Sequence, residues 1–539
     1  MTYRILKPEK WNPDVHLPAS KSISNRALVL NALSGGLPGL LRNVSDCDDT
    51  TVMMEALFLL EMERREGSDC MLPPVVDVKA AGTAMRFLTA LLAVTPGTHT
   101  ITGTERMQHR PIGVLVEALR SLGAQIEYIG EEGFPPLRIT GSILQGGEIE
   151  LAGDVSSQYI SALLMIAPKL QEGLTLRLNG NIISRPYIDM TLAMMRKHGA
   201  NAKWTSYNTL GVEPYPYKPT PYVVEADWSA ASYWFEMLLL NEKHDTTAVL
   251  HGLFNDSLQG DSAVREMFKI LSVSSRTMDF GDDTKTCLLR NGRVPKQIEL
   301  DFTKTPDLAQ TLVVTCALKG IAFRFTGLQS LRIKETDRIA ALQTELAKLG
   351  VRVEVEGDSV MQWAGPDAQP AGKIPYLKPF PGTAIDTYED HRMAMAFAPA
   401  AFVLGSIDIN DPEVVSKSYP SFWEDLERSG VKKTLRPAPP LQSEGDGAEF
   451  ICCGQHAVCE KELLMKAVTE PVEYFDDEEL DRFRGRRSDD YTRDEEEEFR
   501  EVLYTTLPRE VGDWLRSLQL RGIELPEGLR DEALLLADK

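Results

Sequence analysis

Leu17-Pro-Ala-Ser-Lys-Ser-Ile-Ser-Asn-Arg-Ala-Leu-Val-Leu30 gives the strongest single indication of how this chain folds. Residues 18–20 interrupt an extended segment, and residues 25–33 have the apolar spacing of a helix. A hydroxyl-rich turn that opens a helix offers free backbone N–H groups and a favourable dipole to a phosphate. Lys21 adds a point charge there and Arg26 adds a planar guanidinium. The stretch predicts an anion-binding helix start, and a capped helix with two solvated cations is the plain alternative.

The same plan recurs along the chain, where loops with small residues, hydroxyls or cations lead into apolar helices. The further examples are Ala80–Arg86, Arg110–Pro111, Asp154–Gln158, Ser184–Asp189 and Asp390–Arg392. Each of them alone has the ordinary pattern of a helix cap. Leu331–Arg338 differs because it interleaves three cations with two carboxylates. So many cationic helix starts in one chain favour a substrate with more than one anionic group.

Together these segments resemble a known family, the 5-enolpyruvylshikimate-3-phosphate synthases. The resemblance rests on long strings that stand in the family's order: LPASKSISNRALVL, AAGTAMRFLTALLA, RPIGVLVEAL, DVSSQYISALLM, SRPYIDMTL, TPDLAQTLVV, LRIKETDRIAAL and DHRMAMAF. It covers about residues 1–435, and the last hundred or so residues lie outside it. Because the strings are long and numerous, chance is a poor explanation for them.

The resemblance implies a two-domain α/β enolpyruvyl transferase fold, with three repeated α/β units in each domain. The shikimate 3-phosphate domain would span residues 21–224. The phosphoenolpyruvate domain would combine residues 1–20 with 225–436, so the chain would cross between the domains twice. Short apolar strands do alternate with helical segments, with Gly or Pro between them. No repeat is visible in the sequence, so its periodicity alone predicts only an α/β protein of more than one domain.

The resemblance also implies a reaction, in which shikimate 3-phosphate takes the enolpyruvyl group of phosphoenolpyruvate on its 5-hydroxyl and phosphate leaves. Addition needs one proton delivered to the methylene carbon and one removed from the hydroxyl, and elimination needs the reverse. Cations must offset the repulsion between the substrates, and a closed cleft must exclude water. The reaction would belong to chorismate and aromatic amino acid biosynthesis. It implies no cofactor and no metal.

The matching positions take over the family's expected roles. Catalytic roles fall on Asp307 as the proton acceptor and on Lys21, Glu335 and Lys417. Shikimate 3-phosphate would contact Lys21, Ser22, Arg26, Ser156, Ser157, Gln158, Ser184, Asp307 and Lys334, with Tyr187 beside them. Phosphoenolpyruvate would contact Lys21, Gly82, Arg110, Gln158, Arg338, Arg392 and Lys417. Asp390 and His391 flank Arg392 in the same motif, where a supporting role fits His391 equally well.

The residues by themselves leave simpler interpretations open. Asp307 follows Thr-Pro just before an apolar helix, and without the resemblance it would be taken as a helix cap. Lys334, Glu335 and Arg338 have the spacing of ion pairs on a helix surface. A carboxylate placed among Lys and Arg would have a lowered pKa, which favours binding and weakens it as a base.

Four positions depart from the family pattern. Ala80 and Ser330 stand where Asn is common, Phe87 replaces a common Pro, and Arg185 replaces a common Lys. The change at Ala80 matters most, because an Asn amide near phosphoenolpyruvate donates a hydrogen bond worth about 1 kcal/mol. We expect its absence to raise the Michaelis constant without abolishing activity.

The composition limits the remaining possibilities. The chain has 539 residues and a formal net charge of −21, which argues against general nucleic-acid binding. It has no run of about 18 apolar residues, and the first residues lack an apolar signal core. Seven scattered Cys fit a reducing cytoplasm better than a disulfide framework. We therefore expect a cytoplasmic location, no membrane contact and a monomeric synthase part.

The C-terminal segment predicts a separate small domain. Residues 437–447 have the composition of a linker, and residues 448–539 form an acidic segment with helical patterns near 475–483, 492–503 and 508–520. Contact with another protein is one hypothesis for this domain. Zinc binding is a second hypothesis, and a buried strand end is its alternative. The candidate ligands are Cys452, Cys453, His456 and Cys459.

Two rival functions remain at this level. UDP-N-acetylglucosamine enolpyruvyl transferase shares the fold and phosphoenolpyruvate, and its family typically carries a Cys in the loop before the Arg-Pro position. Here that loop is Thr104–His109, which contains no Cys. The other rival is a degenerate, non-catalytic synthase that acts as a scaffold for the acidic tail.

Overall fold

The computed structural model describes two stretches of the chain. They are residues 1–436 except 67–74, 244, 282 and 369–373, and residues 477–529 except 485, 487, 489–490, 506–510, 522 and 524. The chain separates into two compact units, Met1–Pro440 and Leu441–Lys539. The predicted linker 437–447 and the four candidate zinc ligands Cys452, Cys453, His456 and Cys459 lie outside the described residues.

One sheet of the first unit shows the plan of the others. β16 (Gln297–Asp301) leads through α10 (Ala309–Lys319) to the parallel strand β17 (Ala322–Thr326). The helix α11 (Arg338–Lys348) then leads to a hairpin of β18 (Glu354–Glu356) and β19 (Val360–Trp363), whose second strand pairs antiparallel with β17. Parallel strands need such a crossover, and the helix supplies it.

Four more four-stranded sheets repeat this order of a parallel pair followed by an antiparallel hairpin. The first is β4 (Val75–Asp77), α3 (Gly82–Ala93), β5 (Gly97–Thr102), α5 (Gly113–Ser121), β6 (Gln125–Tyr128) and β7 (Leu137–Gly141). The second is β8 (Gly147–Ala152), α6 (Ser157–Ile166), β9 (Leu174–Asn179), α7 (Arg185–Lys197), β10 (Ala202–Trp204) and β11 (Thr209–Val212). The third is β2 (Asp14–His16), α8 (Trp228–Leu240), β13 (Thr247–His251), α9 (Val264–Ile270), β14 (Val273–Asp279) and β15 (Thr284–Arg290).

The remaining two repeats are built from segments far apart in the sequence. β20 (Ala384–Ile385), α12 (His391–Phe397), β21 (Ser406–Asn410), α14 (Phe422–Arg428) and β22 (Lys432–Leu435) are completed by the N-terminal strand β1 (Thr2–Leu6). The last repeat is reduced to the parallel pair β12 (Tyr222–Val223) and β3 (Leu41–Arg42), with α1 (Lys21–Ser34) and α2 (Asp48–Glu66). The predicted fold of repeated α/β units is confirmed, although the repeat is visible in strand pairing and not in the sequence.

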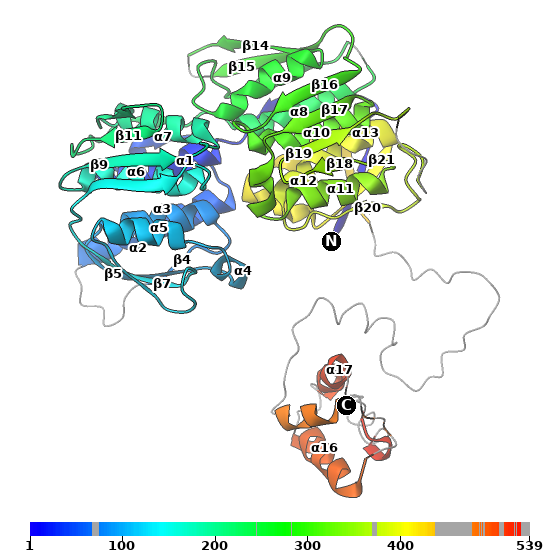
Figure 1. Ribbon diagram of the computed structural model, residues 1–539. Coiled ribbons are helices and arrows are strands. Elements are labelled where there is room, and N and C mark those ends of the chain that lie inside the picture. The colour runs from blue at the N-terminus through cyan, green and yellow to red at the C-terminus, as the bar shows by residue number, and fades with distance from the viewer. Residues whose placement is uncertain are drawn as a thin grey trace. The chain divides into compact units, whose positions relative to one another are not determined.

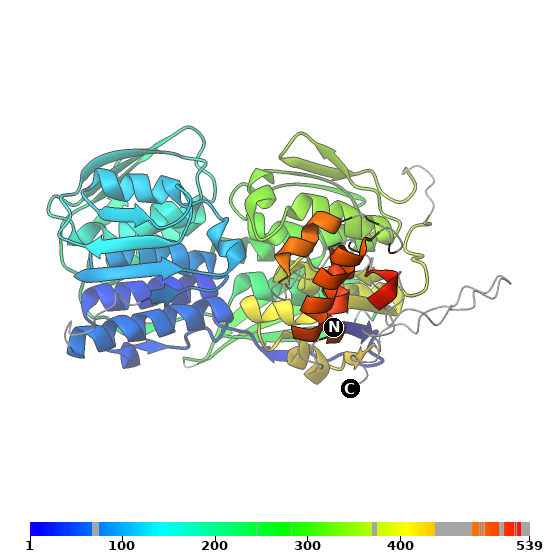
Figure 2. The ribbon, with the colours of Figure 1, turned by 90° about the horizontal axis from the view of Figure 1, so that it is seen from below.

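The first unit has two hydrophobic cores, between which the chain passes at two places. Leu17 still packs in the core that contains Trp228, whereas Ala19 packs in the other core, and the chain returns after Val224. The strands β1 and β2 therefore belong to sheets completed by residues far along the chain. Figures 1 and 2 show these blue N-terminal strands in the lobe that is otherwise green to yellow.

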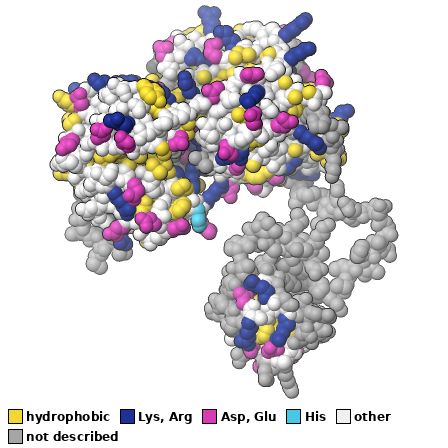
Figure 3. Space-filling view, in the orientation of Figure 1, with side chains coloured by type: hydrophobic (Ala, Val, Ile, Leu, Met, Phe, Trp, Pro, Cys, Tyr) yellow, Lys and Arg dark blue, Asp and Glu magenta, His cyan; other side chains and the backbone are white. Residues whose placement is uncertain are grey.

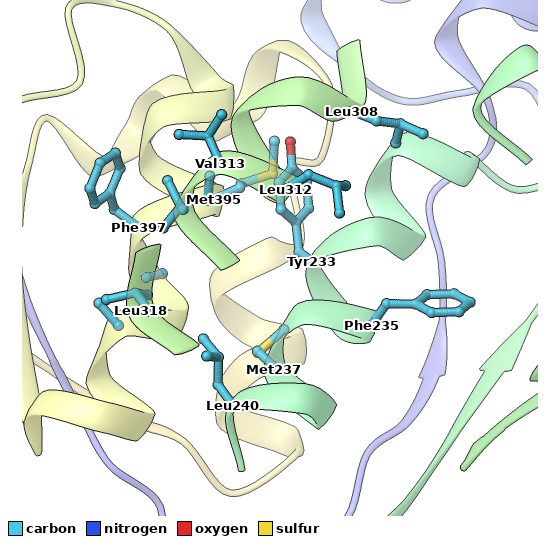
Figure 4. Close-up of a cluster of buried hydrophobic side chains, with 14 of the residues drawn as sticks. Tyr233, Phe235, Met237, Leu240, Leu308, Leu312, Val313, Leu318, Met395 and Phe397 are labelled. Atoms are coloured by element: carbon cyan, nitrogen blue, oxygen red, sulfur yellow. The ribbon is translucent and has the colours of Figure 1, made fainter. Parts of the chain in front are cut away.

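The central helices are buried on every side. All residues of α3 and of α8 are buried, and α10 packs against both α8 and α12. Figure 4 shows Tyr233 of α8, Leu312 of α10 and Met395 of α12 converging in one of these cores. A helix that is apolar all round requires such a central position. Because these helices are fixed by packing, the residues at their N-terminal ends are fixed as well.

Replacing Glu236 by glutamine is expected to raise the melting temperature by a few degrees at about pH 8 and to change it little near pH 4. Glu236 is completely buried on α8, and burial raises the pKa of its carboxyl well above 4.5, with Thr315 offsetting only part of the effect. Between these pKa values the unfolded chain is ionised and the folded chain is not, so rising pH destabilises the fold. Glutamine removes this pH-dependent term. Scanning calorimetry at both pH values tests this, and an effect independent of pH would contradict it.

The described part of the second unit is a small helical cluster. It contains η8 (Glu478–Phe483), α16 (Arg493–Thr505), α17 (Val511–Leu520) and η10 (Glu527–Leu529). The predicted capping box is confirmed, because the Thr492 backbone N donates to Glu495 at 2.8 Å and the Glu495 N to the Thr492 hydroxyl at 3.4 Å. Trp514 is buried and donates its indole N–H to Asp477 at 2.9 Å. Buried apolar residues give this unit a core of its own.

Candidate active site

The helix starts singled out in the sequence begin earlier than predicted. The helix expected over residues 25–33 begins at Lys21, and the one expected from Phe87 begins at Gly82. The predicted loops are therefore first helical turns, because Ser, Gly and Thr are well tolerated where the backbone N–H groups have no partner within the helix. Lys21 and Gly82 thus stand where free N–H groups point out of the helix.

Arg338, the first residue of α11, is the centre of a buried cluster of charges. Its side chain is 1% exposed and contacts three carboxylates. Nε donates to Asp390 at 2.7 Å, Nη1 to Asp307 at 3.1 Å and Nη2 to Glu335 at 2.7 Å. The surface ion pair that the spacing of Glu335 and Arg338 indicated is therefore a buried one. Arg338 holds together the two carboxylates predicted to transfer protons.

Asp307 lies in η4 (Pro306–Leu308) and meets cations from three directions. Its carboxylate is 3.7 Å from Lys334, 3.1 Å from Arg338 and 3.5 Å from Arg392. Burial raises the pKa of Asp307, but Arg392, Lys334 and Arg338 outweigh this effect and hold the pKa well below its usual range. The Tyr187 hydroxyl also donates to Asp307 at 2.7 Å. Asp307 is thus an ionised carboxylate engaged by side chains of several elements, which a helix cap would not be.

A second group of charges joins Lys21 to Lys417. Lys21 Nζ lies 3.3 Å from Asp49 and donates to the Lys417 carbonyl at 3.4 Å, while Lys417 Nζ lies 4.0 Å from Glu335. Burial lowers the pKa of Lys417, although Glu335 and Asp49 oppose it. An ammonium with a lowered pKa gives up its proton more readily near neutral pH. Sequence reasoning missed Asp49, because an acidic helix start such as Asp48-Asp49 has the ordinary pattern of a cap.

Arg26 and Arg86 are buried cations of a different kind. Arg26 donates to the hydroxyls of Thr191 at 2.7 Å and Ser161 at 3.0 Å, and Arg86 donates to the Gly82 carbonyl at 2.9 Å. Among the described residues, neither forms an ion pair with a carboxylate. Burial lowers the pKa of each to about 10. A buried cation with only neutral partners is suited to an anionic ligand.

The remaining predicted residues of the first core lie at the starts of α6 and α7. The Ser156 hydroxyl accepts from the Gln158 backbone N at 3.3 Å, and the Gln158 amide donates to Thr83 of α3 at 3.1 Å. Ser157 is the first residue of α6. Ser184 has a left-handed backbone with φ of 52°, and its N–H donates to the Thr303 carbonyl at 3.1 Å. Strained residues of this kind are concentrated at functional sites.

His391 is buried beside Arg392 without a hydrogen bond. Neither ring nitrogen has a partner, and its Nδ1 lies 3.9 Å from Asp390. Burial, with Lys21 and Arg392 nearby, lowers the pKa of His391 well below its usual value. The imidazole is therefore neutral, which suits a supporting role better than that of a proton donor.

Two departures from the family pattern lie next to site residues. The Phe87 ring lies 5.2 Å from the Arg26 guanidinium, and Arg185 lies 3.9 Å above the Trp204 ring. Both are cation–π contacts. Ala80 is exposed in the turn before α3, so no side-chain contact replaces the missing Asn amide there.

Contacts between the two cores extend to the loop around Arg106. The helix α4 (Glu105–Gln108) carries Arg106, which pairs with Glu389 and donates to the backbone oxygen of Glu335. Ser416 donates to Asp48 at 2.6 Å in the same way. Cationic and anionic side chains are interspersed over the face of residues 1–436 seen in Figure 3, so the cations that can bind anionic substrates stand out by their burial.

Replacing Gly82 by alanine is expected to raise KM for phosphoenolpyruvate at least about tenfold while kcat changes less. A Cβ at Gly82 would stand 2.6 Å from Nη1 of Arg110 and of Arg86. Such a contact forces both guanidinium groups to move, and Arg110 is a predicted phosphoenolpyruvate contact. Steady-state kinetics with each substrate varied tests this. Gly281→Ala, where a Cβ meets nothing within 4 Å, is the matched control for an added methyl.

Cations from both cores surround ionised carboxylates, so the fold and the site define an α/β enzyme that binds small, multiply anionic substrates and moves protons between them. The sequence profile of the EPSP synthase (3-phosphoshikimate 1-carboxyvinyltransferase) family matches residues 5–426. The chain belongs to this family.

Individual relatives agree with the family match. The 3-phosphoshikimate 1-carboxyvinyltransferase of Bacteroides fragilis is 53% identical over 430 residues, which are 80% of this chain and 98% of that protein. The one of Shewanella halifaxensis is 36% identical over 434 residues, or 78% and 97% of the two chains. Among solved structures, EPSP synthase from Acinetobacter baumannii has the same fold, with a TM-score of 0.63 at 22% identity over 81% of this chain and 100% of that chain.

Proposed function

We propose that this chain transfers the enolpyruvyl group of phosphoenolpyruvate to the 5-hydroxyl of shikimate 3-phosphate and releases phosphate. The single observation that carries the proposal is Asp307, an ionised carboxylate held by Arg338, Arg392 and Lys334. Such a group can orient a substrate hydroxyl and take its proton. Family membership over residues 5–426 supports the same reaction.

The substrates would divide between the two groups of buried cations. We propose that shikimate 3-phosphate binds Lys21 and the hydroxyls and cations of the first core, together with Asp307 and Lys334. These first-core residues are Ser22, Arg26, Ser156, Ser157, Gln158 and Ser184. Phosphoenolpyruvate would bind the cations that face Asp307 and Glu335 and the free N–H groups at Gly82. These contacts are Lys21, Gly82, Arg110, Gln158, Arg338, Arg392 and Lys417. The unpaired Arg26 and the exposed helix starts support this division.

In the addition step, Asp307 would take the proton of the 5-hydroxyl while its oxygen attacks C2 of phosphoenolpyruvate. The methylene carbon becomes a methyl group by gaining a proton, which we assign to Lys417 with Glu335 beside it. The lowered pKa of Lys417 supports this assignment, because its ammonium releases a proton more readily than an exposed lysine. Lys21 would neutralise charge on the tetrahedral intermediate.

In the elimination step, the bond from C2 to the phosphate oxygen breaks and phosphate leaves. The methyl group returns one proton, which restores the C=C bond and gives 5-enolpyruvylshikimate 3-phosphate. The residues that delivered the proton can take it back by the same path. The contacts between the two cores at Lys21 and Lys417 support a site that excludes water during both steps.

We also propose that the two cores correspond to two domains, residues 21–224 and residues 1–20 with 225–436. The residues 448–539 would form a separate acidic domain that contacts another protein. Its own described core supports an independently folding unit. A chain ending at Arg436 should keep full activity and lose such a partner. Unchanged partners and oligomeric state would contradict the role of the C-terminal domain.

A cytoplasmic location fits the cysteines, since Cys47, Cys287 and Cys316 are free among the described residues. No helix within the described ranges has the length and apolar character needed to cross a membrane. We propose a monomeric synthase part in this compartment.

Phosphate release from phosphoenolpyruvate, with and without shikimate 3-phosphate, tests the proposed function on the full-length chain. We expect release that depends on shikimate 3-phosphate. No release in spite of shikimate 3-phosphate binding would favour the degenerate scaffold. Release that depends on UDP-N-acetylglucosamine would favour the rival transferase, against which the Thr104–His109 loop without Cys already argues.

A further inference from the structure

The two places where the chain passes between the cores lie side by side. Ala19 and Ala226 form an isolated antiparallel bridge. The Ser20 N–H donates to the Glu225 carbonyl at 2.9 Å, and the Asp227 N–H donates to the Pro18 carbonyl at 2.9 Å. The two strands of this hinge are therefore tied to each other by backbone hydrogen bonds. Lys21 follows directly on one strand, so a displacement of the hinge moves a predicted contact of both substrates.

A third segment, Ser257–Asp261, runs along this hinge and is called the brace below. The Ser257 hydroxyl donates to Glu225 at 2.9 Å. Gln259 accepts from the Trp228 N–H at 3.0 Å and donates to the Ala226 carbonyl at 2.8 Å. Gln259 is only 5% exposed. These buried hydrogen bonds fix the path of residues 225–228 relative to the brace.

The last residue of the brace, Asp261, lies between the hinge and the reacting groups. Ser229 donates its hydroxyl to the buried Asp261 carboxyl. Ser229 also lines a cavity of about 20 Å³ that reaches Lys21 and Arg392. The residue before, Gly260, approaches Pro186 of α7 so closely that a Cβ would stand 2.6 Å from it. Asp261 thus stands where the hinge, α7 and the Arg392 side of the site meet.

The charged and titratable groups around Asp261 come from several elements. Asp307 of η4, Arg392 of α12 and Asp227 at the start of α8 all act on its carboxyl, and Tyr187 of α7 faces it as well. Burial and the Asp307 charge raise the pKa of Asp261 to about 7, while Arg392 and the Ser229 hydroxyl oppose this. The neighbouring helix α9 carries Arg265, which is stacked on Trp228 instead.

We propose that Asp261 is a positioning residue of the active site, which holds the hinge through Ser229 and adjusts Asp307 and Arg392 by its charge. The proposal rests on the proposed function, because it assigns the proton of the 5-hydroxyl to Asp307. Arg338, Arg392 and Lys334 weaken Asp307 as a base. An ionised Asp261 is a like charge beside Asp307 and strengthens it again. Ionisation of Asp261 therefore promotes the addition step.

Single-turnover kinetics of the full-length chain as a function of pH test this proposal. In the wild type, we expect the rate of the chemical step to rise with pH through about pH 7. Asp261→Asn keeps the shape and an acceptor for Ser229 but cannot ionise, so this rise should disappear and the rate at high pH should fall about tenfold. KM for both substrates should change less than the rate does. The wild-type measurement separates the two proposals, because an inactive wild type would reject the function and not the role of Asp261.

A second variant and a control make the assignment specific. Ser229→Ala removes a hydrogen bond that stabilises the charged carboxyl, so the rise should move to higher pH. Asp425→Asn is the matched control, since Asp425 is 2% exposed and accepts a serine hydroxyl, from Ser421 at 3.0 Å, outside the site. It should lower the melting temperature and leave the rise in place. A rise that persists in Asp261→Asn, or that Ser229→Ala does not shift, overturns the proposal.

Discussion

Replacing Asp307 by asparagine is expected to lower kcat about 10³-fold, which is the range that general-base catalysis contributes. Asparagine keeps the size of the side chain and an oxygen that can accept from Tyr187 and Arg338. It cannot take a proton from the 5-hydroxyl, so the loss should fall on the chemical step. Binding of shikimate 3-phosphate should weaken far less than turnover. Pre-steady-state phosphate release and equilibrium binding separate the two effects.

Folding should survive the same change, because the neighbouring cations keep other partners. Arg338 still pairs with Glu335 and Asp390, so the melting temperature should fall by only a few degrees. The control is Asp408→Asn, at a buried carboxylate that pairs with Arg4 at 2.8 Å and Arg436 at 2.6 Å. It should cost stability and leave kcat unchanged. Near-normal turnover in Asp307→Asn would reject Asp307 as the base.

The site could be predicted where its residues stand in local strings. Lys21, Gly82 and Asp307 each lie in a short segment whose small, hydroxyl or charged residues precede an apolar helix. The helix starts themselves were placed about a turn late, since first-turn residues make no hydrogen bond to a preceding turn and carry little periodic signal. The family resemblance supplied the roles, which the pattern alone left as helix caps.

Contacts between distant segments could not be predicted from the sequence. The bond from Lys21 to the Lys417 carbonyl joins residues 396 positions apart, and Ser416 reaches Asp48 over 368 positions. Asp49 and Asp261 acquire their significance only through such contacts. The strand repeat was hidden for a related reason, because each sheet needs only alternating apolar residues and different sequences meet that need.

Arg338→Lys is expected to lower both stability and activity. Arg338 is 1% exposed and joins three carboxylates with separate nitrogens. One ammonium cannot reach all of them, so Asp390, which is completely buried, is left without its cation. Leaving a buried charge unpaired costs about 3 kcal/mol. Denaturant unfolding followed by fluorescence measures this loss.

The activity of Arg338→Lys should fall more than its stability suggests. Arg338 fixes Asp307 and Glu335 relative to each other, and a displacement of about 1 Å at a reacting group can cost about 100-fold in rate. We expect at least that loss in kcat/KM for phosphoenolpyruvate. The control is Arg324→Lys, at an exposed pair with Glu356 at 2.9 Å on the same lobe, where such a pair contributes at most about 1 kcal/mol. Equal effects of the two substitutions would mean that the guanidinium fork of Arg338 does not organise the two carboxylates, and the placement of the proton-transfer groups would have to be sought in α12 and the loop that precedes it.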